Sequence, residues 1–230
     1  MQKMTLMQHF RELKNRVIWS MLFFAVAFGV GFYFVPDLQA AVMTPLLDVW
    51  ANPKMIYTGI ADGLGIEFSL AGLFALLLSA PFWLWQTWRY VSPALKKDEK
   101  KIAVPILLLS PALFVAGAVF AYYILLPIMF RFFLDIGVAG VEMMPNMKDY
   151  LSFSIEILKA FGLAFQLPLL LVLLNRAHVF SRGQILAACR YIVIAIFVVA
   201  AALTPPDIIS QIALALPLCA LFGLSFLFMI

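Results

Sequence analysis

Two carboxylates, Asp98 and Glu99, lie inside the run KKDEKK (residues 96–101), the densest cluster of charge in an otherwise apolar chain. The four lysines suit a short cytoplasmic loop, because lysine and arginine set the orientation of membrane helices. The acids need another explanation, since Asp and Glu contribute little to orientation. They either reduce the repulsion between the lysines or belong to a functional site, and the run alone leaves both interpretations open.

Polar residues also interrupt one of the long apolar stretches, residues 150–174. Glu156 and Lys159 are three positions apart, and we expect them to pair on one helical face. Gln166 lies deeper, and its amide needs a partner because lipid offers none. That partner is either within the chain, such as the backbone carbonyl that Pro168 leaves free, or on another transmembrane helix that docks there.

Asp207 follows the sequence TPP, between the last two apolar stretches. The uninterrupted apolar part of the fifth stretch, residues 191–203, would extend only about 20 Å as a helix, against roughly 30 Å of hydrocarbon. Asp207 would then lie near membrane depth, where an acid is costly and commonly functional. It could also cap the following helix by accepting backbone N–H bonds, and the two roles are compatible.

Signatures of catalysis are missing from the sequence. It contains no HExxH, GxSxG or P-loop motif. Asp62 begins a DGLG segment that is superficially similar to the motif of intramembrane aspartyl proteases, but no second membrane aspartate pairs with it. Cys189 and Cys219 lack the spacing of metal ligands or of a disulfide, and His9 and His178 stand alone. We therefore expect no enzyme activity, no metal and no cofactor.

The composition is typical of an integral membrane protein. Hydrophobic residues make up 65% of the 230 residues, charged residues make up 12%, and the mean hydropathy is +1.02. We predict a single all-α membrane domain of six transmembrane helices, because six stretches are long and apolar enough to cross a bilayer. These stretches are residues 17–35, 68–90, 102–126, 150–174, 185–203 and 208–230. Kinks at Pro81 and Pro168, with short last two helices, would make the bundle curved.

The distribution of lysine and arginine predicts the orientation of the chain. Basic residues gather before the first span, between the second and third, and between the fourth and fifth, whereas the two long loops opposite are rich in acids. The basic residues are Lys3, Arg11, Lys14, Arg16, Arg89, Lys96, Lys97, Lys100, Lys101, Arg176, Arg182 and Arg190. Positively charged segments stay in the cytoplasm, so we expect both termini to be cytoplasmic.

Four segments of the chain match, in order, the hallmark sequences of one family. They are HFRELKNR, SAPFWLWQTWRYVSPALKKDEKK, YLSFSIEILKAFGLAFQLP and LTPPDIISQ. They resemble TatC, the six-span core subunit of the twin-arginine protein translocase. This resemblance covers nearly the whole chain and implies a receptor in the bacterial cytoplasmic (inner) membrane.

The resemblance also implies a set of site residues. Signal-peptide binding falls on Glu12, Glu99, Lys14, Arg16, Pro81 and Tyr90, and partner-helix docking or buried polar contacts fall on Gln166, Asp207 and Pro45. Pro45 and Pro81 correspond to the loop prolines of the family. Lys14 replaces the usual arginine and lacks its planar fork, and Gln166 replaces the usual glutamate and cannot ionise.

A signal peptide with two consecutive arginines presents two guanidinium forks, each of which a carboxylate can bind through charge-assisted bonds. The resemblance assigns this task to Glu12 and Glu99, with the proton-motive force supplying the energy of transport. The implied partners are signal peptides, the single-span subunits TatA and TatB, further copies of the chain and lipid, without nucleic acid. The alternative is a proton- or ion-coupled secondary transporter that uses Glu156, Lys159, Gln166 and Asp207.

Overall fold

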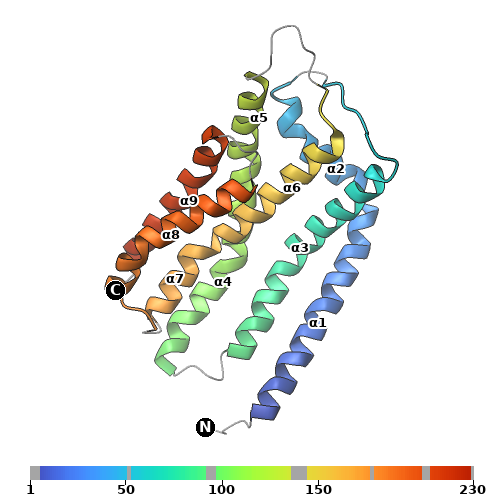
Figure 1. The fold of residues 1–230 in the computed structure, drawn as a ribbon. Helices are drawn as coiled ribbons and strands as arrows, with labels where there is room; N and C mark the ends of the chain where they lie inside the picture. Colours follow the sequence, from blue (N-terminus) through green and yellow to red (C-terminus); the bar gives the residue numbers. More distant parts are fainter. Residues whose placement is uncertain are drawn as a thin grey trace.

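The chain folds into helices that run up and down in an elongated bundle (Figure 1). The computed structural model describes residues 6–50, 53–91, 97–135, 144–176, 179–203 and 208–228. The helices are α1 (Leu6–Tyr33), α2 (Val35–Leu47), α3 (Asp62–Val91), α4 (Lys97–Phe120), α5 (Leu126–Asp135), α6 (Met147–Ala164), α7 (Gln166–Arg176), α8 (Arg182–Leu203) and α9 (Ile208–Phe228). A π-helical turn, Ala121–Leu125, joins α4 to α5. The β-structure of the described residues is limited to one isolated bridge. The all-α prediction is therefore confirmed.

Five segments of the described chain are long and apolar enough to cross a membrane. They are Arg11–Tyr33, Asp62–Thr87, Leu109–Asp135, Met147–Asn175 and Arg182–Ala202, and a shorter apolar segment, Gln211–Leu227, lies in α9. Each of the six expected spans therefore coincides with a helix or a pair of consecutive helices. The last span falls short of the length that the other five reach.

The fifth span is longer than its uninterrupted apolar run suggested. α8 has 22 residues, which corresponds to about 33 Å of helix. The charged Arg190 lies inside it, and its guanidinium carbon is 4.8 Å from the centre of the Tyr191 ring. A cation over an aromatic face is favourable, and a long side chain can extend along the helix to more polar surroundings. The apolar run 191–203 is thus the second part of a longer helix that begins at Arg182, and α8 and α9 are shorter than α1 and α3, as expected.

Prolines shape the spans differently from our expectations. Pro168 cannot donate to the carbonyl four residues earlier, and α6 ends there, at Ala164. The fourth span is accordingly divided into α6 and α7, as expected for a break near Pro168. Pro81 lies inside α3, within the second predicted span, and Pro45 lies inside α2. The loop positions that the resemblance implied for these two prolines are therefore wrong.

The third span continues beyond Pro127, where we expected it to end. Pro127 deprives the carbonyl of Tyr123 of its usual donor, and the helix widens into the π turn immediately before it. Within this turn the backbone N–H of Leu126 donates to the carbonyl of Ala121, five residues earlier. The chain then resumes an α-helix to Asp135, because one π turn removes the conflict without ending the helix.

α1 packs against α3 along most of its length (Figure 1). Gly31 allows the two backbones to approach, because a Cβ there would lie 2.9 Å from the carbonyl oxygen of Ala71. Aromatic rings fill the wider part of the contact. Phe23 stacks on Phe82 with their ring centres 4.7 Å apart, and Phe32 meets Phe68 edge-on with their ring centres 5.0 Å apart. Small residues at the close contact and interlocking side chains elsewhere are how membrane helices associate.

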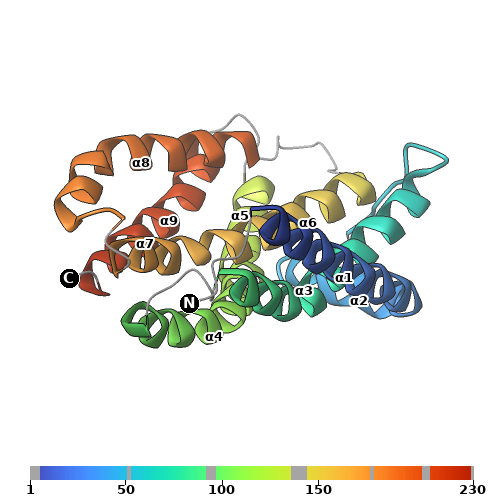
Figure 2. The ribbon, with the colours of Figure 1, turned by 90° about the horizontal axis from the view of Figure 1, so that it is seen from below.

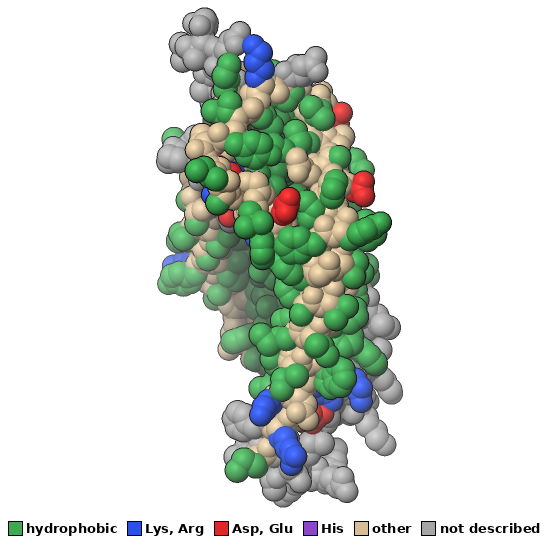
Figure 3. All heavy atoms as spheres, turned by 90° about the vertical axis from the view of Figure 1, so that its right-hand side faces the viewer, with side chains coloured by type: hydrophobic (Ala, Val, Ile, Leu, Met, Phe, Trp, Pro, Cys, Tyr) green, Lys and Arg blue, Asp and Glu red, His purple; other side chains and the backbone are tan. Residues whose placement is uncertain are grey.

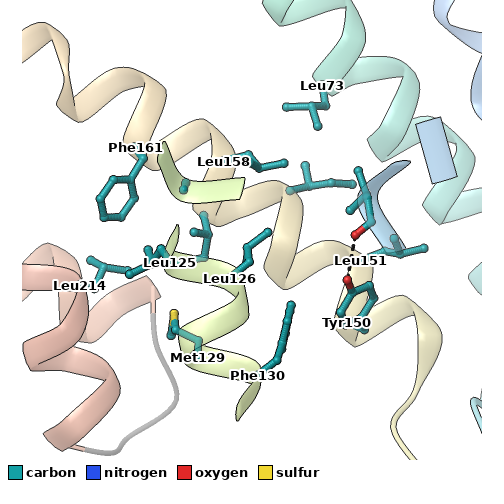
Figure 4. Close-up of a cluster of buried hydrophobic side chains, with 14 of the residues drawn as sticks. Leu73, Leu125, Leu126, Met129, Phe130, Tyr150, Leu151, Leu158, Phe161 and Leu214 are labelled. Carbon is teal, nitrogen blue, oxygen red and sulfur yellow. Dashed lines mark hydrogen bonds between the residues drawn. The ribbon is translucent and has the colours of Figure 1, made fainter. Parts of the chain in front are cut away.

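The central core forms where α3, α5, α6 and α9 meet (Figure 4). Leu158 and Phe161 of α6, Met129 of α5 and Leu214 of α9 are buried in it. The phenolic hydroxyl of Tyr150 donates to the backbone carbonyl of Val42 at 2.8 Å. This bond attaches α2 to the start of α6, so the short helix between α1 and α3 is held against the core.

The segment before α3 is hydrogen-bonded to the start of α6, at the end of the bundle opposite the chain's N-terminus. The backbone N–H of Met147 donates to the carbonyl of Ile56 at 3.0 Å. Nearby, the ammonium of Lys148 lies 2.9 Å from a carboxylate oxygen of Asp62, whose other oxygen accepts the backbone N–H of Gly59 at 2.6 Å. Asp62 therefore fixes the start of α3.

The helices form an open arrangement and not a closed ring (Figure 2). α1 to α3 lie on one side, α7 to α9 on the other, and α4 to α6 connect them. In Figure 1, α1 begins, α3 ends, α4 begins and α7 ends toward the lower end of the bundle, and α9 runs back toward the same side. The three basic segments of the sequence therefore adjoin the same end.

We predict that Gly117→Ala in α4 destabilises the protein by about 1–3 kcal/mol, the usual cost of forcing extra atoms into a packed contact. A Cβ at Gly117 would overlap the backbone carbonyl of Phe161 and lie 2.8 Å from the ring of Phe165. Thermal unfolding of the purified protein in detergent measures the change. Gly29→Ala in α1 is the matched control, because a Cβ there meets no atom within 4 Å. Equal unfolding temperatures for the two variants would contradict the prediction.

Candidate functional site

Two adjoining pockets lie between α1 and α3 toward the end where the chain begins. The larger, of about 600 Å³, is lined by Arg11, Glu12, Asn15, Arg16, Trp19, Phe82, Gln86 and Arg89. The smaller, of about 160 Å³, is lined by Leu13, Arg16, Val17, Ser20, Trp83, Gln86, Thr87 and Tyr90. We call the two together the α1–α3 groove. Arg16 and Gln86 line both pockets and therefore stand at their boundary.

Helical periodicity explains why these side chains face one another. Residues three, four and seven positions apart share one face of an α-helix. Glu12, Asn15, Arg16 and Trp19 have this spacing in α1, and so do the residues that α3 contributes to the smaller pocket, from Trp83 to Tyr90. Because α1 and α3 pack side by side, these polar faces meet just beyond the aromatic contact of Phe23 with Phe82.

Glu12 is engaged in the groove by an arginine of its own helix. The Nε and Nη2 atoms of Arg16 both donate to the same oxygen, Oε1, of Glu12, with Nε at 3.2 Å. The remaining terminal nitrogen, Nη1, donates to the amide oxygen of Gln86 in α3 at 3.2 Å. The Arg16 side chain is 15% exposed and that of Glu12 is 26% exposed, so both are shielded from most of the solvent.

Cationic groups outnumber acids in this groove. Arg11, Arg16 and Arg89 line its larger pocket, and Glu12 is the one acid among the described residues that line it. The guanidinium of Arg89 lies 5.6 Å from the centre of the Trp85 ring, where the aromatic face holds it. Figure 3 shows the same pattern more widely, with basic side chains at the lower end, a broad hydrophobic band above them, and most visible acids in the upper half.

The structure brings together some of the predicted site residues. Glu12, Arg16 and Tyr90 line the α1–α3 groove. Lys14 is exposed and lines neither pocket, because it projects from another face of α1. Pro81 is exposed in α3, next to Phe82, and it also lines neither.

Three further predicted positions have different outcomes. Glu99 lies near the start of α4, and its side chain is outside the described part, as is the whole of Asp207. Pro45 is buried in α2 near the opposite end of the bundle, away from the groove (Figure 1).

Sequence reasoning missed Asn15, Gln86 and Arg89. Asn15 could have been found, because it is three residues after Glu12 and so shares its helical face. Gln86 was visible as an amide among aromatic residues in FWLWQTWR. Its pairing with Arg16 depends on the register between α1 and α3, which no local pattern indicates.

Gln166 begins α7, just after the break in the fourth span, and is bonded inside the protein. Its amide nitrogen donates to the backbone carbonyl of Ser110 at 2.8 Å, and its amide oxygen accepts the hydroxyl of Ser110 at 2.6 Å. The intramolecular partner is thus Ser110 of α4 and not the carbonyl freed by Pro168. The reason is that this carbonyl is on the same helical turn, whereas the side chain reaches across to α4.

Of the four residues that a secondary transporter would use, Asp207 lies outside the described part, and Gln166 is bonded to Ser110. Glu156 and Lys159 are both exposed and form no ion pair with each other, so their expected pairing is wrong. Exposed charges three positions apart gain little from pairing. The described residues also contain no group of three or more His, Cys, Asp or Glu side chains that could hold a metal ion.

These features define a class: a helical, multi-pass membrane protein with a polar groove at the basic end of its first two long helices. The model of the family described as Sec-independent protein translocase protein (TatC) matches residues 8–217. This chain belongs to the TatC family and is therefore a component of the Sec-independent protein translocase.

Curated relatives and solved structures agree with this assignment. TatC of Azotobacter chroococcum is 36% identical over 99% of this chain and 89% of its own length, and TatC of Escherichia coli K12 is 34% identical over 97% and 87%. Two crystal structures described as the twin-arginine translocase receptor TatC, one of them in DDM, superpose with TM-scores of 0.87 and 0.86. Each is 32% identical to this chain, and they cover 95% and 96% of it and 98% and 97% of their own chains.

We predict that Ser110→Ala destabilises the protein by about 1–2 kcal/mol, because it leaves the half-buried amide oxygen of Gln166 without a donor. Thermal unfolding in detergent is again the measurement. Ser69→Ala is the control: the Ser69 hydroxyl only donates to the carbonyl of Gly65 in its own helix, so its loss leaves no other side chain unsatisfied. A loss no larger than that of the control would show that the bond to Gln166 contributes little.

Proposed function

We propose that this chain binds twin-arginine signal peptides in the α1–α3 groove. The supporting observation is a carboxylate, Glu12, in a groove that is lined both by polar groups and by the aromatic side chains Trp19, Phe82 and Trp83. A carboxylate can bind a guanidinium through charge-assisted bonds, and the aromatic surface suits the apolar part of a signal peptide. The structural relatives described as a twin-arginine translocase receptor have the same fold.

Glu99 is the proposed partner of Glu12 in this task. Its position near the start of α4 follows the end of α3, whose last turns line the groove. Two carboxylates would receive two arginines, and the surrounding cations would oppose binding of other positively charged ligands. Lys14, Arg16, Pro81 and Tyr90 are proposed as further residues of the same site. Of these four, Arg16 and Tyr90 line the groove itself.

The proposal extends to topology and assembly. We place the groove and both termini in the cytoplasm, because the basic segments adjoin one end of the bundle. The chain would lie in a bacterial cytoplasmic membrane and assemble there with TatA, TatB and further copies of itself. The proton-motive force would supply the energy, and Asp207 and Pro45 would support docking or the fold.

The first test of this function is a pair of substitutions, Glu12→Gln and Glu99→Gln. Each removes one charge-assisted pair, so we expect twin-arginine peptide affinity to fall roughly ten- to hundredfold, or by about 1.5–3 kcal/mol. Fluorescence anisotropy with a labelled peptide and the purified protein measures this. Glu67→Gln, an exposed acid near the other end of α3, should leave affinity unchanged. Unaltered affinity in both test variants would remove this site from consideration.

Gln166 is the proposed docking point for a partner transmembrane helix. It lies at the junction of α6 and α7, and a polar side chain of an incoming helix could exchange with Ser110 as its partner. Gln166→Leu should therefore reduce co-purification with TatA or TatB while leaving peptide binding intact. Gln166→Glu should restore or strengthen association if the residue acts through charge. Normal co-purification of the leucine variant would contradict this role.

A further inference from the structure

Polar contacts in the α1–α3 groove hold Glu12 to an arginine of the same chain. Two nitrogens of Arg16 donate to Oε1 of Glu12, and the third donates to Gln86. The carboxylate that would receive an arginine of the signal peptide is thus already bonded to a guanidinium. Any incoming guanidinium that uses the same oxygen must displace Arg16.

The geometry makes Arg16 an effective local competitor. It lies one helical turn after Glu12, so the pair forms without any rearrangement of loops. An exposed pair at this spacing is weak, but here both side chains are largely shielded and α3 contributes Gln86 as an extra acceptor. Gln86 therefore braces Arg16 in the orientation in which it covers Glu12.

The charge balance of the groove also favours a Glu12 that is covered by Arg16. Among the described residues that line the larger pocket, Arg11, Arg16 and Arg89 outnumber the acid Glu12 by two charges. These cations oppose the approach of a peptide with two arginines. Moving the Arg16 guanidinium away from the carboxylate exposes the negative charge and reduces the local positive charge beside it.

We propose that Arg16 occupies the guanidinium site of Glu12 until a signal peptide arrives, and that peptide binding exchanges one guanidinium for another. This inference rests on the proposed function of the groove. The apparent affinity is then lower than the intrinsic affinity by the fraction of molecules in which Arg16 is released. Gln86 lowers that fraction, because it stabilises the state in which Arg16 is bonded to Glu12.

The opposite role for Arg16 is to orient the carboxylate for the peptide, and the two roles give different results. An internal competitor lowers the affinity for every cationic ligand by the same factor, because its displacement costs the same in each case. An orienting residue would favour a planar guanidinium fork over an ammonium group. The ratio of affinities for arginine and lysine peptides therefore distinguishes competition from orientation.

The experiment measures binding of two labelled peptides to the purified full chain in detergent. One peptide has the twin arginines, and in the other a lysine replaces one of them. With Arg16→Gln we expect both peptides to bind about three- to tenfold more tightly, with the ratio of their affinities unchanged. Arg11→Gln removes a positive charge from the same pocket without touching the Glu12 contact, so its gain should be smaller. If Arg11→Gln increased the affinity as much as Arg16→Gln, general repulsion between positive charges would explain both results. The proposed exchange would then be wrong.

A double-mutant cycle tests the part assigned to Gln86. Gln86→Leu should tighten peptide binding about twofold in the original chain, because Arg16 is then less firmly held over Glu12. The same substitution should have no effect in the Arg16→Gln background. Weaker binding in both backgrounds would mean that Gln86 contacts the peptide directly, which would overturn its role as a brace.

Glu12→Gln separates failure of this inference from failure of the proposed function. If Glu12→Gln binds the peptide as tightly as the original chain, Glu12 does not bind the signal peptide. Both the proposed binding site and the proposed exchange are then wrong. If Glu12→Gln loses binding but Arg16→Gln shows no gain, the receptor function stands and the exchange is wrong. Should Arg16→Gln unfold at a lower temperature, Arg16→Lys provides the second variant. It retains the charge but loses the two-donor contact, and absence of a gain for both peptides would equally overturn the exchange.

Discussion

Hydrocarbon offers no hydrogen-bond partner, and this constraint accounts for the polar contacts that link distant parts of the bundle. Gln166 is satisfied by both the hydroxyl and the carbonyl of Ser110, and Tyr150 by the carbonyl of Val42. In the last two helices the amide of Gln211 donates to the carbonyl of Phe197 at 3.1 Å. Each bond joins helices that are separate in sequence, so satisfying a polar group also fixes how two helices pack.

The same constraint governs the backbone wherever proline interrupts it. Proline removes one donor and disturbs one carbonyl, and this chain accommodates that in three ways. At Pro81 the helix continues, at Pro127 a π turn precedes the proline, and at Pro168 the helix ends and restarts. The restart has a further consequence, because it places Gln166 at the head of α7, opposite Ser110.

The α1–α3 groove differs from the rest of the bundle, because its polar groups satisfy one another in a largely cationic surrounding. Close packing at Gly31 and the stacked rings of Phe23 and Phe82 fix the register of the two helices. That register decides that Arg16 meets Gln86 and not one of the neighbouring aromatic residues. A receptor site of this kind depends on rigid helix packing some distance away, as is common for precisely placed polar groups.

Much of this protein follows from the sequence alone. Hydropathy determined the membrane class and the approximate spans, since about 20 apolar residues have few alternatives to a membrane helix. The charges assigned the basic segments to one side, and the pattern HFRELKNR identified Glu12 as a candidate. These features depend on residues near one another in the chain, so local patterns were sufficient to predict them.

Tertiary structure alone decided which partners the polar side chains use. The resemblance assigned Glu12 to ligand binding without naming a partner within the chain, and the structure shows that Arg16 engages it with the help of Gln86, which is 70 positions away from Arg16. For Gln166 the sequence left open either the carbonyl freed by Pro168 or a group on another helix, and the structure pairs it with Ser110, at a separation of 56 positions. The helix α2 around Pro45 lies almost entirely outside the predicted spans, and it too depends on contacts with distant segments. Hydrogen bonds of this kind depend on how two helices are aligned along their axes, and that alignment results from packing over many side chains that no single segment contains.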